Sequence, residues 1–153
     1  MWVEHERRWE ASDRMMPQYH AVIAAVATAA VGLALHPGVA LSMLLVWIAT
    51  SAVVAAVIDL DVMAHVARAA KQDPSLQRWT DPRNVGNDFR GFIEALRARG
   101  LLRLAGMTHL GISAVIVVAA WLLLPSLLVP VIIGVTTHLA TDLQYLRAPA
   151  TAT

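Results

Sequence analysis

The residues best suited to chemistry are a histidine and an aspartate four positions apart in the apolar run V-T-T-H-L-A-T-D at Val135–Asp142. Positions i and i+4 of a helix lie on one face, so His138 and Asp142 are close enough to hold one ion or share one proton. Such a pair inside a membrane helix usually marks a functional site. The alternative is a polar helix end, at which Asp142 meets lipid headgroups and His138 hydrogen-bonds a neighbour.

Other histidines and aspartates also lie within apolar runs or at their ends. A buried polar group without a partner is costly, so each of these side chains needs one. The chain has no cysteine, which leaves His, Asp and Glu as transition-metal ligands, and these suit zinc or manganese. The sequence therefore predicts a divalent metal site, for zinc or for manganese. Its candidate ligands are His20, Asp59, Asp61, His109, His138 and Asp142.

The alternatives for these residues are structural. The histidines could bond to backbone carbonyls, and the aspartates could form a simple polar helix end. Asp59 and Asp61 also point about 200° apart on a helix, so both can face one ion only if the helix unwinds between them.

Composition indicates the framework that must position these groups. Of the 153 residues, 58% are hydrophobic and only 15% are charged, which is too apolar for an ordinary soluble domain. Four apolar segments are each about long enough to cross a ~30 Å hydrocarbon core. We predict an all-α membrane protein whose four transmembrane helices form two hairpins in one domain, residues 17–146. The predicted spans are 17–35, 38–58, 104–124 and 126–146.

The segments outside the spans are polar. We expect an amphipathic N-terminal segment at 1–16, a loop with short interfacial helices at 59–103, and a disordered tail at 147–153. Within the loop, apolar residues at i, i+3, i+4 and i+7 form one stripe that lies on the membrane or roofs the bundle. They are Phe89, Phe92, Ile93 and Leu96.

Charge placement predicts the orientation. Three of the twelve Lys and Arg residues precede the first span, eight lie between the second and third spans, and Arg147 follows the fourth. By the positive-inside rule, both termini and the central loop of this multi-pass membrane protein face the cytoplasm. Counted from the outer turns, His20, Asp59, His109, His138 and Asp142 then lie about 20–33 Å inward, near one cytoplasmic level.

The order of these residues resembles the YdjM-like family of membrane-bound metal-dependent hydrolases. The family's opening histidine falls on His20, its Asp-x-Asp on Asp59 and Asp61, its Thr-His on Thr108-His109 and its closing His-x-x-x-Asp on His138 to Asp142. That family is in turn distantly similar to zinc-dependent phospholipases C and single-strand nucleases. The chain departs from the family pattern at Ile58, Val62, Leu104-Ala105 and Leu110, which removes two imidazoles and one cation.

The resemblance implies a membrane-embedded hydrolase that acts on a phosphoester or lipid headgroup at the cytoplasmic face. The metal would activate water, with Asp61 or Asp59 as the catalytic base, and Arg90 is a candidate contact for a substrate phosphate. The alternatives are a non-catalytic scaffold or interaction protein tied together by the His/Asp cluster, and, third, an ion conduit. Membrane lipids are the expected partners. We expect no nucleic-acid partner, since the basic loop is explained by topology and anionic lipid.

Overall fold

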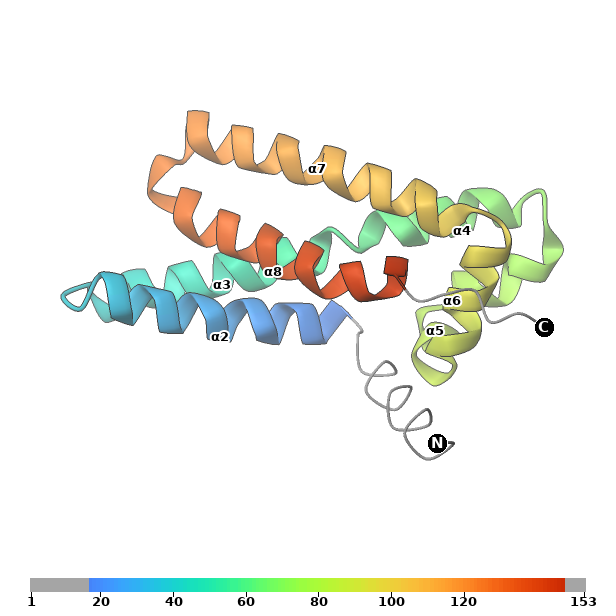
Figure 1. Cartoon of the computed structure of the whole chain (residues 1–153), viewed down its shortest axis with the longest axis horizontal. Coiled ribbons are helices and arrows are strands. Elements are labelled where there is room, and N and C mark those ends of the chain that lie inside the picture. The colour runs from blue at the N-terminus through green and yellow to red at the C-terminus, as the bar shows by residue number, and fades with distance from the viewer. Residues whose placement is uncertain (1–16, 148–153) are drawn as a thin grey trace.

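The computed structural model describes residues 17–147, and side chains from Gln18 to Leu143. The predicted amphipathic segment at 1–16 and the tail from 148 lie outside the described residues. Four helices among the described residues are long and apolar enough to cross a membrane. They confirm an all-helical membrane fold built from two hairpins (Figure 1).

The first hairpin joins α2 (Pro17–Leu35) to α3 (Leu41–Val57). Pro17 opens α2, where a missing N–H is harmless. The connecting turn is closed by a hydrogen bond from the Val39 amide to the His36 carbonyl at 2.9 Å. The second hairpin joins α7 (Leu101–Leu123) to α8 (Leu128–Arg147) through the short 3-10 helix η2 (Pro125–Leu127). Both tight turns therefore lie at the same end of the bundle (Figure 1).

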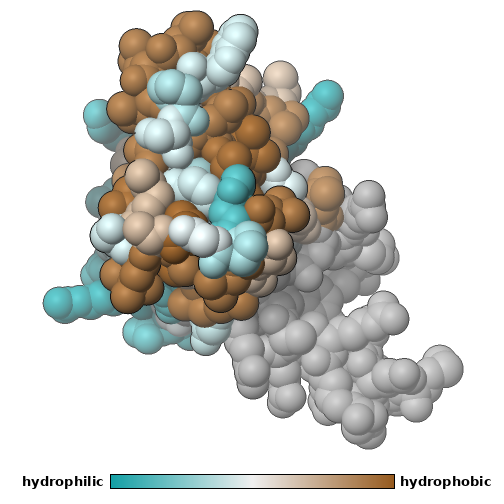
Figure 2. Space-filling view, turned by 90° about the vertical axis from the view of Figure 1, so that its left-hand side faces the viewer, coloured by the Kyte–Doolittle hydropathy of each residue, from teal (hydrophilic) through white to brown (hydrophobic). Residues whose placement is uncertain are grey.

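Helix α8 is the centre of the bundle. It packs against α2 and α3 on one side and α7 on the other, while α7 also packs against α4 (Leu60–Ala70). The outward faces are apolar and exposed, as is usual for helices surrounded by lipid. Figure 2, which views the end with the two tight turns, shows mostly hydrophobic surface with a few pale and hydrophilic residues.

Small residues allow α3 and α8 to approach closely. The Ser51 hydroxyl, fully buried, donates to backbone carbonyls of Ile48 at 3.0 Å and Ala24 at 3.3 Å, so it also ties α3 to α2. On α8, a Cβ added at Gly134 would lie 2.7 Å from the backbone oxygen of Ser51. Apolar helices in lipid associate through such close packing and interhelical polar contacts.

We expect Gly134→Ala to destabilise the bundle by about 1–3 kcal/mol, because the added methyl group meets backbone that cannot rotate away. Its thermal midpoint in detergent should fall by several degrees. Gly111→Ala is the matched control, since a Cβ at Gly111 on α7 meets nothing within 4 Å. That variant should match or exceed the wild-type midpoint, and equal midpoints for both variants would contradict the close packing.

The second end of the bundle carries a small helical cap, defined here as the C-terminal half of α4 with η1 (Pro74–Thr80), α5 (Pro82–Asn87) and α6 (Phe89–Ala98). Three aspartates start its helices, each by accepting a backbone N–H: Asp73 from Ser75, Asp81 from Arg83 and Asp88 from Gly91. Gly100, with a φ of 69°, ends the cap in the left-handed conformation, from which α7 starts.

The cap has its own apolar core and surface ties. Its buried residues are Val66, Ala70, Leu76, Trp79, Phe92 and Leu96. Hydrogen bonds to the exposed Asp73 carboxyl lower its pKa to about 2, and the one from Ser75 has a larger effect than the one from Arg99. That carboxylate therefore stays charged, and the Arg99–Asp73 pair stays formed, throughout the neutral range.

The helices differ from the predicted segments at several ends. Helix α4 follows α3 after a turn at Ile58-Asp59, so residues 60–70 of the predicted loop prolong the second apolar helix. Helix α7 begins at Leu101 rather than 104, because Gly100 provides the reversal and Arg103 is accommodated in the first turn. Helix α8 includes Arg147, the first residue of the predicted tail.

Candidate metal centre

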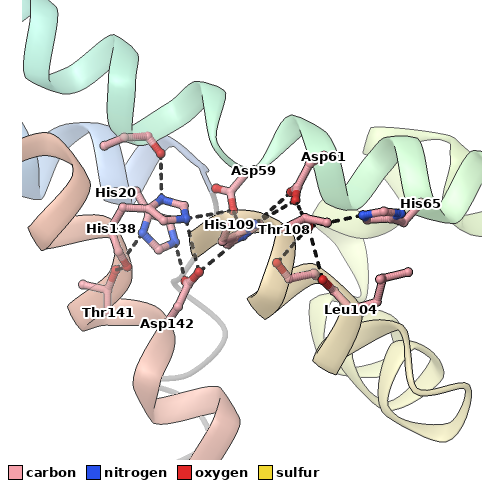
Figure 3. Close-up of polar contacts among 12 residues, drawn as sticks. His20, Asp59, Asp61, His65, Leu104, Thr108, His109, His138, Thr141 and Asp142 are labelled. Carbon is pink, nitrogen blue, oxygen red and sulfur yellow. Dashed lines mark hydrogen bonds and ion pairs between the residues drawn. The ribbon is translucent and has the colours of Figure 1, made fainter. Parts of the chain in front are cut away.

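Four side chains from α7, α8 and the α3–α4 junction meet where the bundle joins the cap. Asp59, His109, His138 and Asp142 each offer one ligand atom, and these atoms all lie within 4.8 Å of one another. We call these four residues the His/Asp cluster (Figure 3). His109 and His138 are buried and the two aspartates are partly buried, so the cluster is largely withdrawn from solvent.

The distances within the cluster suit a metal ion. Asp142 Oδ2 lies 3.2 Å from His138 Nε2 and 3.5 Å from His109 Nε2. Asp59 Oδ1 lies 3.8 and 3.9 Å from the same two nitrogens. Ligands at 2.0–2.1 Å from a tetrahedral zinc ion are roughly 3.3 Å apart, so small side-chain adjustments would complete such a site. The four residues could therefore hold one divalent ion.

Hydrogen bonds orient both imidazoles of the cluster. Nδ1 of His138 lies 2.8 Å from the Ala55 carbonyl, which can only accept, so this nitrogen carries the proton and donates. Nδ1 of His109 lies 3.0 Å from Asp61 Oδ2 and donates in the same way. In the neutral tautomer that these bonds select, each Nε2 presents a lone pair to the cluster. This arrangement is typical of metal-binding histidines.

His20 lies beside the cluster rather than within it. Its Nε2 is 3.6 Å from Asp142 Oδ1, and its ring centroid is 4.5 Å from that of His138. The Thr141 hydroxyl donates its proton to the backbone carbonyl of His138 in its own helix, and it accepts a hydrogen bond from His20 Nδ1 at 2.7 Å. His20 is therefore protonated on Nδ1, like the other two histidines, and its Nε2 faces Asp142.

Asp61 occupies a position that sequence spacing did not predict. We expected Asp59 and Asp61 to face one ion only if the helix unwound. The residues at the junction keep helical backbone angles, and the two carboxylates instead contact opposite edges of one imidazole. Asp59 faces His109 Nε2, while Asp61 holds Nδ1 from behind (Figure 3). Asp61 thus supports the cluster without joining its four ligand atoms.

Two hydroxyls that were not predicted as site residues complete the surroundings. Thr108 donates to Asp61 Oδ2 and lies 3.2 Å from His65 Nε2, so His65, Thr108, Asp61 and His109 form one connected chain. Thr141 holds His20, as described above. Their signal in the sequence is a threonine directly before a candidate ligand, in Thr-His at 108–109 and Thr-Asp at 141–142.

Arg90, the predicted phosphate contact, lies on α6 in the cap. Its guanidinium pairs with Glu94 at 3.0 Å one turn farther along the same helix, and both side chains are exposed. Such i,i+4 pairs at the surface contribute little stability. Arg90 therefore remains a predicted substrate contact only.

Comparison with family models, with curated proteins and with solved structures gives no match. Function is therefore inferred from the chemistry of the His/Asp cluster itself.

Two buried acceptor atoms test whether the cluster fits a metal ion. Within the described part of the chain, His138 Nε2 and Asp59 Oδ2 are buried and have no hydrogen-bond partner. Buried polar atoms in folded proteins are nearly always paired, because leaving one unpaired costs free energy. With Nδ1 protonated, His138 Nε2 and Asp142 Oδ2 are two acceptors only 3.2 Å apart. A cation, either a divalent metal or a proton, must satisfy them, and the donor set of two imidazoles and two carboxylates suits a divalent metal.

Proposed function

We propose that this chain is a metal-dependent hydrolase of the YdjM-like type, acting on a phosphoester or lipid headgroup at the cytoplasmic face of the inner membrane. Asp59, His109, His138 and Asp142 would hold the metal, with zinc favoured over manganese. The observation that carries the proposal is the convergence of two Nε2 lone pairs and two carboxylates on one point in a largely buried site. The order of the motifs in the sequence also supports it.

Metal held at this position would supply Lewis-acid polarisation of the phosphoester and lower the pKa of bound water. The residues of the chain then have distinct tasks. Asp59 is the better placed catalytic base, because it faces the Nε2 atoms of His109 and His138 and its Oδ2 has no hydrogen-bond partner that would compete for the proton from water. The water oxygen would bond to phosphorus, the ester P–O bond would break, and the leaving alkoxide would take up the proton that Asp59 had accepted and depart as the alcohol. Asp61 keeps the proton of His109 on Nδ1 and so holds its ring in place.

Hydrolysis by the purified protein tests this proposal. Zinc-loaded or manganese-loaded protein in lipid nanodiscs should release phosphate-containing product from a phosphoester substrate, and Asp59→Asn should lower the rate about 10²–10⁴-fold. Metal content is measured on the same samples, so that loss of a base is distinguished from loss of the ion. Ser113→Ala, on α7 outside the cluster, is the matched control and should keep the wild-type rate.

A scaffold is the second candidate function, and one observation favours it. The contacts of the His/Asp cluster connect α7, α8 and the α3–α4 junction, and His20 adds α2, so the cluster and His20 together link the four apolar helices of the described residues. A protein that binds the metal at full occupancy and hydrolyses no phosphoester would be such a scaffold.

Membrane orientation gives a separate prediction. Because the chain has no cysteine, single cysteines can report topology. Gly38 in the first tight turn and Gln77 in the cap are both exposed. In intact cells, a membrane-impermeant maleimide should label Gly38→Cys and should label Gln77→Cys only after permeabilisation. Labelling of Gln77→Cys in intact cells would place the cap and the cluster on the outer side.

A further inference from the structure

A cavity of about 120 Å³ lies between the cap and the bundle and reaches the His/Asp cluster. Its polar lining comes from Asp59, His109 and Asp142. The ligand atoms of these three residues lie within 4.8 Å of one another, so the polar part of the wall is confined to one place. The rest of its wall is apolar and comes mainly from α4, α6 and α7. Representative lining residues are Val62, Met63, Phe89, Ile93, Leu102 and Ala105.

The apolar stripe of α6 explains why this wall exists. Phe92 and Leu96 bury their side chains in the cap core, whereas Phe89 and Ile93 on the same face remain half-buried. All four line the cavity. The stripe therefore roofs the end of the bundle beside the cluster. Side chains around an unfilled apolar space forgo contacts that a hydrocarbon group would supply.

We propose that this cavity binds the hydrocarbon part of an amphiphilic phosphoester whose phosphate is placed at the His/Asp cluster. The inference rests on the proposed function and adds the substrate class. An elongated ligand with one anionic end matches a cavity whose polar groups are gathered in one place. Two carboxylates would repel a phosphate, so the phosphate end requires the metal, whereas the apolar end does not.

The size of the cavity sets the length of hydrocarbon that it can hold. An engineered apolar cavity of about 150 Å³ binds benzene, so a cavity of about 120 Å³ accommodates a segment of roughly four to six carbons. Burial of each methylene group in such a site tightens binding about fourfold. A longer chain would project from the cavity and gain little more.

A series of n-alkylphosphonates, from methyl to octyl, tests the proposal in zinc-loaded protein by calorimetry in nanodiscs. Affinity should rise about fourfold per methylene and level off at about four to six carbons. Ile93→Trp should bind methylphosphonate normally but lose the gain with chain length, and Ile93→Ala should move the plateau to longer chains. Leu110→Trp, on the exposed face of α7, is the control for partition into lipid and should behave as wild type.

The outcomes separate this inference from the proposed function. If methylphosphonate binds and chain length has no effect, the apolar site is overturned and the metal-dependent function stands. If methylphosphonate does not bind, the proposed function and the phosphate end both fall. A titration of the metal-free protein with benzene then tests whether the cavity binds an apolar ligand. A saturable shift of the Ile93 methyl resonance, without a shift of the resonance of the lipid-facing Ile132, supports an apolar ligand site. Equal responses at the two residues overturn it.

Discussion

Replacing His138 by alanine is expected to remove metal from the purified protein, with affinity falling more than about 100-fold, because loss of a supporting partner alone typically costs about 10–100-fold. His138 is fully buried and presents Nε2 to both carboxylates of the cluster. Metal content per chain, measured after purification in detergent with added zinc, should be near one for the wild type and negligible for the variant.

Folding must be separated from ligation in this experiment. His138→Gln is a second variant, since its amide can still donate to the Ala55 carbonyl that His138 Nδ1 contacts at 2.8 Å. His36→Ala is the matched control, because His36 lies at the first tight turn against Trp47 and outside the cluster. The control should retain its metal. Equal, negligible metal in wild type and His138→Ala would mean that a proton, rather than a metal ion, satisfies the buried acceptors.

Asp61 should affect metal binding in a different way. Asp61→Asn replaces the charged acceptor that holds the Nδ1 proton of His109 by a weaker, neutral amide but leaves all four ligand atoms in place. We expect metal affinity to fall about 10–100-fold, as for other supporting partners of ligand histidines. Competition with a chromophoric chelator measures this loss. A loss as complete as that in His138→Ala would instead make Asp61 a ligand.

The location of the cluster could be predicted from the sequence because it depends on distance along each helix. Apolar runs define the spans, and the rise per residue places His109, His138 and Asp142 at one depth. The three Asp residues that start the cap helices are equally local signals, because capping involves only neighbouring residues. Depth and local capping required no knowledge of how the helices pack.

The rotation of each helix could not be predicted in this way. Which of Asp59 and Asp61 faces the cluster depends on how α7 packs against α4, and that packing is a tertiary property. The partners that select the histidine tautomers are also contributed by other helices, as with the Ala55 carbonyl for His138. The cap was expected as a loop with short interfacial helices and one apolar stripe, yet Leu76 and Trp79, which lie outside that stripe, also form part of its core.

Chelation should lower the thermal midpoint of the wild-type protein by roughly 10 °C. A ligand that binds only the folded state at 1,000 times its dissociation constant stabilises that state by about 4.1 kcal/mol. For a chain of this length, each kcal/mol corresponds to a shift of about 2–4 °C. The effect should be large because the cluster joins α7 and α8 to the α3–α4 junction.

Asp142→Asn tests whether this stabilisation passes through the cluster. The substitution nearly preserves shape but removes the charge that lies 3.2 Å from His138 Nε2 and 3.5 Å from His109 Nε2. Its midpoint should start lower than that of the wild type and respond weakly to chelator. Ser113→Ala is the matched control: Ser113 is buried one turn from His109, and its hydroxyl has no hydrogen-bond partner among the described residues. That variant should respond to chelator as the wild type does.

The combination of results distinguishes three roles for the cluster. A chelator-sensitive wild type with an insensitive Asp142→Asn variant indicates a metal site that also holds the helices together. If chelator has no effect on the wild type but the Asp142→Asn variant has a lower thermal midpoint than the wild type, the cluster is a protonated ion pair with a structural role. If the midpoint is unchanged by both the chelator and the substitution, the cluster neither binds metal nor stabilises the bundle, and both the hydrolase and the scaffold proposals fail.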